Sequence, residues 1–568
     1  MSMNRIEFSL SLAFFLALSA AVTATAHGQE EEAAQPDRFF SDKVSDAAAE
    51  GEEPEETLLQ GSLTSSTFAY RESGGIASGA MIVNADNASP VSRFYTDVRA
   101  QIDAMHIGGG SWDLRIDSRA RLTRSCELNP LLNGRDDLLG PCRIQSGLYG
   151  ENEYDVRELY LQRRGDKMDF KLGRQYVLEL AATKIDGIKV DYASSDNVTL
   201  LGFAGLYPAR GSRSINEDYP AIDLGNGMLG SRIMPVAGGV GASYRYGELY
   251  GSVGGVGILP RADEIDPRGG VAPLPEATRF FVTSNGYWRQ SRKLDVYHFA
   301  VVDLQGAGGT GLTNLSVGVN FKPSTDLRVN AAVNRVDTET LNVNAQNRLE
   351  DTDVNSNIIQ NNIEVTRIAS EAFRLGVSGA FKQQRFEVSV SGQLRQRPDI
   401  QIQAGNPNQS TVFGAARSGE VMLSVIDRKS WNDFRLGASV LRILSIGNET
   451  FRRSISTLGR LHATKDFGSG KGQYELDVSY LNGRDTSGVN CTVAIVNQGV
   501  DPLGCFGNTK VSTIGLGGTT YYRFSRDWFG MASLSAARQA FTTREAGLAI
   551  SQTPNTLLSG FLRLAYRF

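Results

Sequence analysis

Long hydrophobic runs are missing from this 568-residue sequence once its first 26 residues are passed. A membrane-spanning helix needs about 20 consecutive apolar residues, so a helical protein with several membrane spans is excluded. A transmembrane β-barrel is not excluded, because its strands alternate apolar and polar residues and contain no such run. A mean hydropathy of −0.23 and a hydrophobic share of 41% are compatible with that fold.

Histidine and the usual catalytic motifs are also scarce. None of the histidines stands beside a serine or acid motif, and the sequence holds no GxSxG, HExxH, Walker or CxxC motif. An embedded hydrolase is therefore the weaker class of function, and we expect no enzyme, no cofactor and no metal. Asp351, Asp353, Asn355 and Asn357 alternate as calcium ligands can, but the glycine and later glutamate of such loops are missing, which favours a plain solvated loop.

Cysteine is rare, and its spacing is informative. The four cysteines fall into two local pairs, Cys126 with Cys142 and Cys491 with Cys505. In an exported protein such pairs suggest two disulfides that close loops. Free thiols are the alternative, and metal ligation is not expected because no histidine lies nearby.

The first 56 residues differ in composition from the rest. Residues 1–26 have a basic residue, an apolar stretch and small residues at Ala24 and Ala26, which predicts a cleaved signal peptide, with a membrane anchor as the alternative. Between Glu30 and Glu56 there are eleven acidic residues against two basic ones, a local charge of −9 in a chain of net charge −4. We expect residues 27–56 to form an acidic, disordered periplasmic linker, or else a short helix docked in a barrel mouth.

Alternating segments begin at Thr57 and recur every twenty or so residues. Between Asp113 and Thr123 every odd position is polar and the even positions are mostly apolar. Charged residues that share one face need water, because burying them unpaired costs several kcal/mol each, roughly. The polar face either covers a soluble sheet or lines a water-filled lumen. Predicted strands of ten to sixteen residues exceed the usual five or six of soluble sheets and favour the membrane barrel.

Short and long connections alternate along the chain. We predict short turns at residues 108–111, 165–169, 194–198, 245–250, 290–294, 323–327, 382–385, 427–432, 468–472 and 525–528. The long connections lie near residues 126–152, 211–232, 340–365 and 486–510. Outer-membrane barrels have short periplasmic turns and longer outside loops, so an even number of strands is expected, with the N-terminus and the C-terminus both in the periplasm. The fold prediction is an all-β antiparallel up-and-down transmembrane barrel over residues 57–568, with about 22 strands, 18 or 20 remaining open, and no plug domain.

The last twelve residues, LLSGFLRLAYRF, form an amphipathic strand that ends in an aromatic residue. This pattern resembles the C-terminal signal of bacterial outer-membrane β-barrel proteins. The resemblance implies that the barrel-assembly machinery recognises this strand and that the protein lies in the outer membrane, in contact with lipid and lipopolysaccharide. No nucleic-acid partner is expected.

The stretch from Tyr154 to Tyr192 resembles porins of the alginate-export type. The matching residues are Glu158, Tyr160, Gly173, Arg174, Gln175, Asp186 and Gly187. The 18 strands of that family differ from our strand count. The resemblance implies a Gram-negative porin that passes a hydrophilic solute or an exported polysaccharide.

Arg174 breaks the regular alternation of its strand. It shares parity with Phe170 and Leu172, so a regular strand would point it at lipid, at a cost of about 2–4 kcal/mol at the midplane. Either a bulge at Gly173 turns Arg174 inward, or Arg174 lies at the headgroup level; we favour the bulge, because glycine is the residue that bulges use.

The remaining charged strand positions suggest a pore lining. We predict that it contains Arg115, Asp117, Arg119, Arg121, Glu158, Arg174, Lys189, Arg385, Glu387, Arg395 and Arg397. These charges either set a transverse field that selects among solutes, or simply pair across strands in a wet lumen. The sequence thus predicts a channel for hydrophilic solutes or an exported polysaccharide, with a closed structural or adhesion barrel as the alternative.

Overall fold

The computed structural model describes residues 57–73, 91–127, 152–208, 214–215, 218–219, 221–223, 229–232, 234–259, 278–305, 310–338, 368–383, 385–397, 400–403, 410–413, 416–430, 433–447, 453–486, 510–545, 548–551 and 554–568. The expected signal peptide and linker, the loop with Asp351 and Asn357, and Cys142, Cys491 and Cys505 lie outside these residues, as does the side chain of Cys126. The described part contains no helix that is long and apolar enough to cross a membrane.

Antiparallel strands dominate the described chain. They are β1 (Leu58–Ser73), β2 (Val91–Met105), β3 (Trp112–Glu127), β4 (Glu153–Arg163), β5 (Met168–Val177), β6 (Thr183–Ser195), β7 (Val198–Leu206), β10 (Val236–Tyr246), β11 (Leu249–Leu259), β12 (Arg279–Ser291), β13 (Leu294–Gln305), β14 (Gly311–Ser324), β15 (Leu327–Thr338), β16 (Ile368–Phe381), β17 (Phe386–Arg397), β20 (Ala416–Asp427), β21 (Arg435–Gly447), β22 (Arg453–Phe467), β23 (Gly472–Thr486), β24 (Lys510–Arg523), β25 (Trp528–Glu545) and β27 (Asn555–Arg567).

Short elements lie in the connections. They are the 3₁₀ turn η2 (Ile107–Gly109), the hairpins β8 (Ala221–Asp223) with β9 (Leu229–Arg232) and β18 (Ile400–Gln403) with β19 (Ser410–Phe413), and β26 (Leu548–Ser551). The main sheet has 23 strands, of which β26 pairs only with the end of β25. The other 22 form the barrel wall, as predicted.

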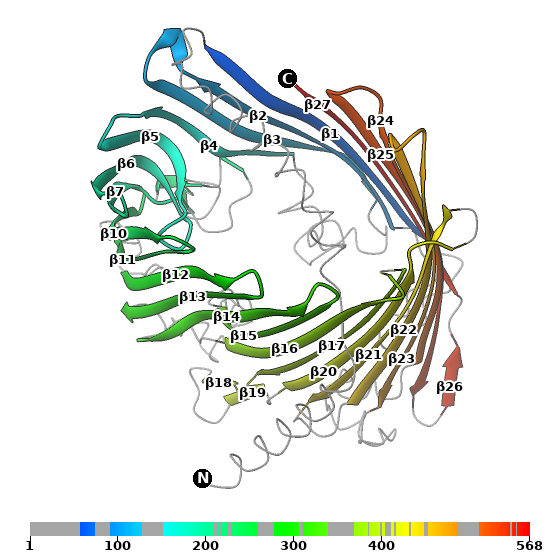
Figure 1. Ribbon diagram of the computed structural model, residues 1–568. Coiled ribbons are helices and arrows are strands. Elements are labelled where there is room, and N and C mark those ends of the chain that lie inside the picture. Colours follow the sequence, from blue (N-terminus) through cyan, green and yellow to red (C-terminus); the bar gives the residue numbers. More distant parts are fainter. Residues whose placement is uncertain are drawn as a thin grey trace.

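The first and last strands of the wall pair with each other and close the barrel (Figure 1). Their register runs from Ser62 opposite Arg567 to Ser73 opposite Thr556. The last residue is held too, because the Phe568 amide donates to the Gly61 carbonyl and the Gly61 amide donates to the Phe568 carbonyl. The edge that a terminal strand would expose is thereby removed.

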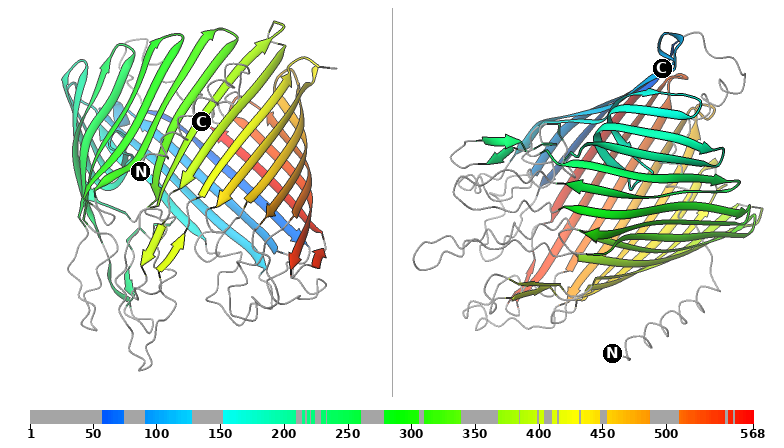
Figure 2. Two further views of the ribbon diagram at one scale, coloured as in Figure 1. Left: turned by 90° about the horizontal axis from the view of Figure 1, so that it is seen from below. Right: turned by 90° about the vertical axis from the view of Figure 1, so that its left-hand side faces the viewer.

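Connections of two lengths separate the ends of the barrel. Each of the ten predicted short turns falls between two consecutive strands of the wall, and all ten lie at one end, which we call the short-turn end. The longer connections leave the opposite end, which we call the long-loop end and which also has one short connection, residues 178–182 between β5 and β6. Figure 2 shows the strands tilted between the two ends. The predicted alternation is therefore confirmed in the described chain.

The strands turn an apolar face outward. Leu534 (73% exposed), Val240 (71%) and Leu516 (59%) are among the many large apolar side chains left uncovered on this face. Cross-strand register keeps such residues together, as where Val478 lies opposite Leu516. Aromatic rings gather near the short-turn end, with ring centroids 5.7 Å apart for Phe467 and Tyr522. An apolar band with aromatic residues at its edge is the pattern of a barrel surrounded by lipid.

Candidate functional site

The inward face of β2, β3 and β4 carries a ladder of paired charges. The closest pairs are Arg99 Nη2 with Asp117 Oδ2 at 2.7 Å, Arg115 Nε with Glu158 Oε2 at 2.5 Å, Arg121 Nε with Asp97 Oδ1 at 2.7 Å and Arg119 Nη2 with Glu153 Oε2 at 3.1 Å. Each guanidinium therefore has a carboxylate on an adjacent strand. The predicted pore residues of this region lie on the inward face, and their charges are largely cancelled locally.

A bulge in β4 adds charge to this ladder. The register with β3 shifts between Asp117 and Ser118, so that Asp117 lies opposite Glu158 and Ser118 opposite Val156. Arg157, the extra residue, reaches Asp117 at 3.9 Å. The side chains of two consecutive residues, Arg157 and Glu158, therefore both lie on the inward face. In a regular strand, consecutive side chains point to opposite faces.

The β5–β6 hairpin bends away from the wall. Pairing of β4 with β5 stops at Leu159 opposite Arg174, whereas pairing of β5 with β6 continues to Val177 opposite Thr183. Gly173 makes the bend with a φ of 128°, where other residues would be strained. The hairpin tip, residues 178–182, consequently leaves the cylinder and packs inside it.

An apolar cluster holds the hairpin against the lumen wall. Val177, Leu180 and Ile185 are fully buried and pack on Phe203 of β7 and Val256 of β11, among others. The inward face is apolar here because the hairpin covers it. Burial of one such side chain contributes about 1.5–3 kcal/mol, so several together fix the hairpin in place.

A notch of two glycines receives the hairpin tip. Gly241 of β10 lies opposite Gly254 of β11, and a Cβ on either would lie 2.9 or 2.5 Å from Leu180 Cδ2. The Ser252 hydroxyl donates to the Glu179 carbonyl at 2.7 Å, and the Thr183 hydroxyl donates to the Leu180 carbonyl at 2.6 Å. These contacts define the position of the tip.

Arg174 lies in the gap that the bend opens. It is 7% exposed, and its guanidinium pairs with Asp186 Oδ2 at 2.5 Å and with Asp218. It also donates to the Val156 carbonyl of β4 at 3.1 Å, and the Tyr219 hydroxyl donates to Asp186 at 2.7 Å. The distortion at Gly173 therefore takes Arg174 out of the lipid-facing position, but into a buried polar cluster rather than into the open lumen.

Lys189 is on the inward side of β6, yet the hairpin tip covers it. It is 3% exposed, and its Nζ lies 2.8 Å from Glu179 Oε1 and 3.1 Å from Asp191 Oδ2. Burial alone raises the pKa of Glu179, but the nearby Lys189 ammonium outweighs it, and the pKa lies below its ordinary value. Lys189 thus helps to hold the hairpin tip.

The predicted pore residues near β17 lie at both of its ends. Arg385, just before the strand, has its Nε 3.0 Å from Asp427 Oδ1 at the short-turn end, and Glu387 pairs with Arg428 there. Arg395 and Arg397 lie near the long-loop end of the same strand. The structure brings neither group together with the ladder of β2, β3 and β4.

A neutral wall lies elsewhere in the barrel. On β14 and β15 the middle inward positions carry amides and hydroxyls, and the Ser316 hydroxyl donates to Asn334 Oδ1 at 2.7 Å. Arg328 shares this face nearer the short-turn end. Asn320 lies opposite Asn330 in the same register. The inward surface therefore has a sector of paired charges and a sector whose middle carries neutral polar groups.

Sequence reasoning did not find the inward hairpin. A signal for it is nevertheless present, because β7 and β11 are apolar on both faces, which membrane strands with a wet inner face are not. The partners Asp218 and Tyr219 were also missed, since they come from a connection distant in sequence. Among the described residues no group of histidine, cysteine and acidic side chains could hold a metal ion.

No family model matches this chain, and no curated protein matches it. Among solved structures, OccAB1 of Acinetobacter baumannii is 11% identical, with 90% of this chain and 97% of that chain covered and a TM-score of 0.35. OmpT of Vibrio cholerae is 10% identical, with 90% and 97% covered and a TM-score of 0.30. A bacterial polysaccharide outer membrane secretin is 11% identical, with 60% and 92% covered and a TM-score of 0.29. At these values the likenesses support no conclusion about function, and membership of the alginate-export type stays a prediction.

The architecture itself defines a class. A closed antiparallel barrel with an uncovered apolar outer face and a polar, ion-paired inner face is the outer-membrane type of transmembrane β-barrel.

Proposed function

We propose that this protein is an outer-membrane channel that passes hydrophilic solutes through a water-filled lumen. The observation that carries the proposal is the ladder of charged residues on the inward face of β2, β3 and β4. Arg99 and Arg115 keep 37% and 41% of their side chains exposed although both are ion-paired. Charged groups with this exposure need water beside them, and a barrel that holds water can conduct solutes.

The paired arrangement indicates what the lumen does to a solute. Because each arginine of the ladder has a carboxylate close by, the wall offers hydrogen-bonding groups without a large net field. We propose that Arg115, Asp117, Arg119, Arg121 and Glu158 line the pore. Selection would then act through size and hydrogen bonding more than through the sign of the solute's charge.

A structural barrel with a closed lumen is the second candidate. The observation that favours it is the β5–β6 hairpin, whose tip is packed inside the barrel by the fully buried Leu180. Conductance distinguishes the two functions.

The test is reconstitution of the full-length protein in planar bilayers. We expect steady openings, with uptake of neutral solutes into liposomes that decreases as solute size increases. Absence of current from protein that still migrates as a folded barrel in unheated gels would favour the structural function. Block of single channels by a soluble polysaccharide, but not by its monomer, would extend the proposal to polymer export.

A further inference from the structure

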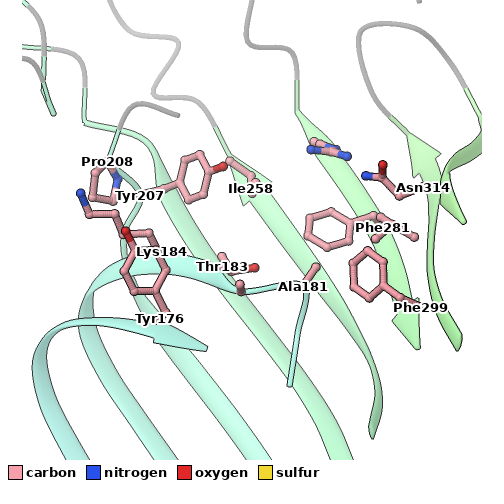
Figure 3. Close-up of a pocket in the computed structure, with 13 residues that line it drawn as sticks. Tyr176, Ala181, Thr183, Lys184, Tyr207, Pro208, Ile258, Phe281, Phe299 and Asn314 are labelled. Carbon is pink, nitrogen blue, oxygen red and sulfur yellow. The ribbon is translucent and has the colours of Figure 1, made fainter. Parts of the chain in front are cut away.

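A cavity of about 290 Å³ lies beside the hairpin tip, towards the long-loop end. We call it the rim pocket. Its walls come from the hairpin (Ala181, Thr183), from the chain just after β7 (Tyr207) and from β12, β13 and β14 (Phe281, Phe299, Asn314). Figure 3 shows Tyr207 on one side of this space and the two phenylalanines on the other. Its volume is near the lower end of the range for ligand sites, about 300–1,000 Å³, and suits one ring-sized solute.

The two cations of the rim pocket are already neutralised. Lys184 Nζ lies 3.5 Å from Asp218 Oδ1, and Arg279 Nη2 lies 2.9 Å from Asp303 Oδ1. Asp218 and Asp303 are 1% and 0% exposed. A charged ligand would have to compete with one of these ion pairs, and drawing Arg279 away from the fully buried Asp303 is costly. Asp218 is held more firmly still, because it also pairs with Arg174. The pocket therefore favours an uncharged ligand.

The remaining lining is aromatic and polar at once. Arg279 lies over the Phe281 ring at 4.8 Å, and Phe281 is 5% exposed, whereas Phe299 and Tyr207 are only partly buried. The Asn314 amide points towards Phe281 in Figure 3 and makes no hydrogen bond to another described side chain or backbone group. An amide offers a donor and an acceptor together, and hydroxyl groups need both.

From this geometry we propose that the rim pocket binds a neutral sugar ring. Such a ring has apolar C–H faces that pack on aromatic side chains and hydroxyl edges that bond to an amide, and it carries no charge. The inference rests on the proposed channel function and names its solute class, with the pocket acting as a first binding site at the long-loop end. The β5–β6 hairpin supplies one wall of the rim pocket. The buried Leu180, which holds the hairpin tip in place, therefore also maintains the shape of the pocket.

The experiment is calorimetric titration of the full-length protein in detergent with glucose, glucuronate and uridine. We expect binding of glucose, weaker binding of glucuronate and no tighter binding of uridine. Asn314→Ala should weaken glucose binding about tenfold, the usual effect of one lost hydrogen bond. Asn330→Ala, which removes an inward amide outside the pocket, is the matched control and should leave glucose binding unchanged.

Phe299→Ala gives a second, independent probe, and folding of each variant is checked by its mobility in unheated gels. Glucose binding that survives both Asn314→Ala and Phe299→Ala, or tighter binding of glucuronate or uridine, overturns the proposal. A conducting barrel that binds no glucose overturns the sugar assignment and leaves the channel function standing. A barrel that binds glucose but carries no current supports the assignment and overturns the channel function.

Discussion

Charged residues of this barrel are held in place by ion pairs with residues of neighbouring segments. Asp117 has Arg99 at 2.7 Å and Arg157 at 3.9 Å, so one carboxylate balances two guanidinium groups of the lumen wall. Arg174, in contrast, is removed from the lumen by a single glycine and paired with aspartates instead. Arginine–aspartate pairs thus occur both on the inward face of the barrel wall and in a buried polar cluster.

Asp117→Asn should make the channel more selective for anions. The substitution keeps the shape of the side chain but leaves Arg99 and Arg157 without their shared carboxylate, so the local potential of the lumen becomes positive. The measurement is the reversal potential under a salt gradient. Asp196→Asn, in the exposed turn between β6 and β7, makes the same change of charge away from the ladder and should leave the reversal potential unchanged. An equal shift in both variants would contradict a local effect.

At the scale of elements, the β5–β6 hairpin is the part that departs from a regular barrel. Its bend requires Gly173, and its seat requires the notch of Gly241 and Gly254 on β10 and β11. Ala181 and Ala182 in the tip have φ of 55° and 51°, a conformation that costs non-glycine residues about 1–2 kcal/mol each. The buried apolar cluster stabilises the tip enough to maintain it.

Gly254→Val should displace the hairpin tip. The Cβ of the new side chain would lie 2.5 Å from Leu180 Cδ2 and closer still to the Val240 carbonyl oxygen of β10, and overpacking of this kind costs about 1–3 kcal/mol. We expect a lower unfolding temperature and noisier single-channel currents. Gly255→Val, on the outward face of the same strand, is the control, since its Cβ would meet nothing closer than 3.9 Å. Equal destabilisation by both substitutions would mean that the notch is not what holds the tip.

Glu179→Gln should make one stabilising contact of the hairpin independent of pH. The folded protein lowers the pKa of Glu179, so its carboxylate contributes stability above the pKa of the unfolded chain, about 4.3, and loses it as pH falls through the lower folded value. The wild type should therefore be more stable than the variant at pH 7, by about 1.5–3 kcal/mol for a charged hydrogen bond to Lys189. The difference should be smaller at pH 3, which lies below the pKa of the unfolded chain.

The unfolding temperatures of both proteins in detergent at the two pH values provide the measurement. Comparison with the variant isolates Glu179 from Asp191, Lys171 and the other groups that titrate or carry charge nearby. A difference of the same size at both pH values would contradict the assigned role of the carboxylate.

At the scale of the whole molecule, two features determine the surfaces of the barrel: the sheet closes on itself, and each strand has one outward and one inward face. In the described chain twenty-two strands pair in one ring, which removes the open edges of the wall, and the outward face is mostly apolar, with polar exceptions such as Arg442 opposite Val421. The inward face is then free to differ from sector to sector, with charge on β2 to β4, an apolar cluster under the hairpin, and amides on β14 and β15.

Leu534→Arg should prevent assembly, whereas Ser535→Arg should not. Leu534 is 73% exposed on the outward face of β25, and an arginine there would meet hydrocarbon at a cost of about 2–4 kcal/mol. Ser535, its neighbour, is inward and bonds to Ser559 at 2.6 Å, so an arginine there would meet water. The measurement is the fraction of each variant that inserts into lipid vesicles and resists protease. Equal insertion of both variants would show that this face does not touch lipid.

The sequence by itself determined the alternation of each strand, the short turns and the even strand number, because all of these depend on a period of two and on local turn residues. Tyr474, Leu476 and Val478 face outward for a reason visible in the strand alone. The tertiary structure alone decided where the β5–β6 hairpin goes, which aspartates meet Arg174, and that Tyr207 and Phe299 line one pocket. Those contacts join segments far apart in the chain, and their geometry depends on strand register around a closed ring, which no local pattern specifies.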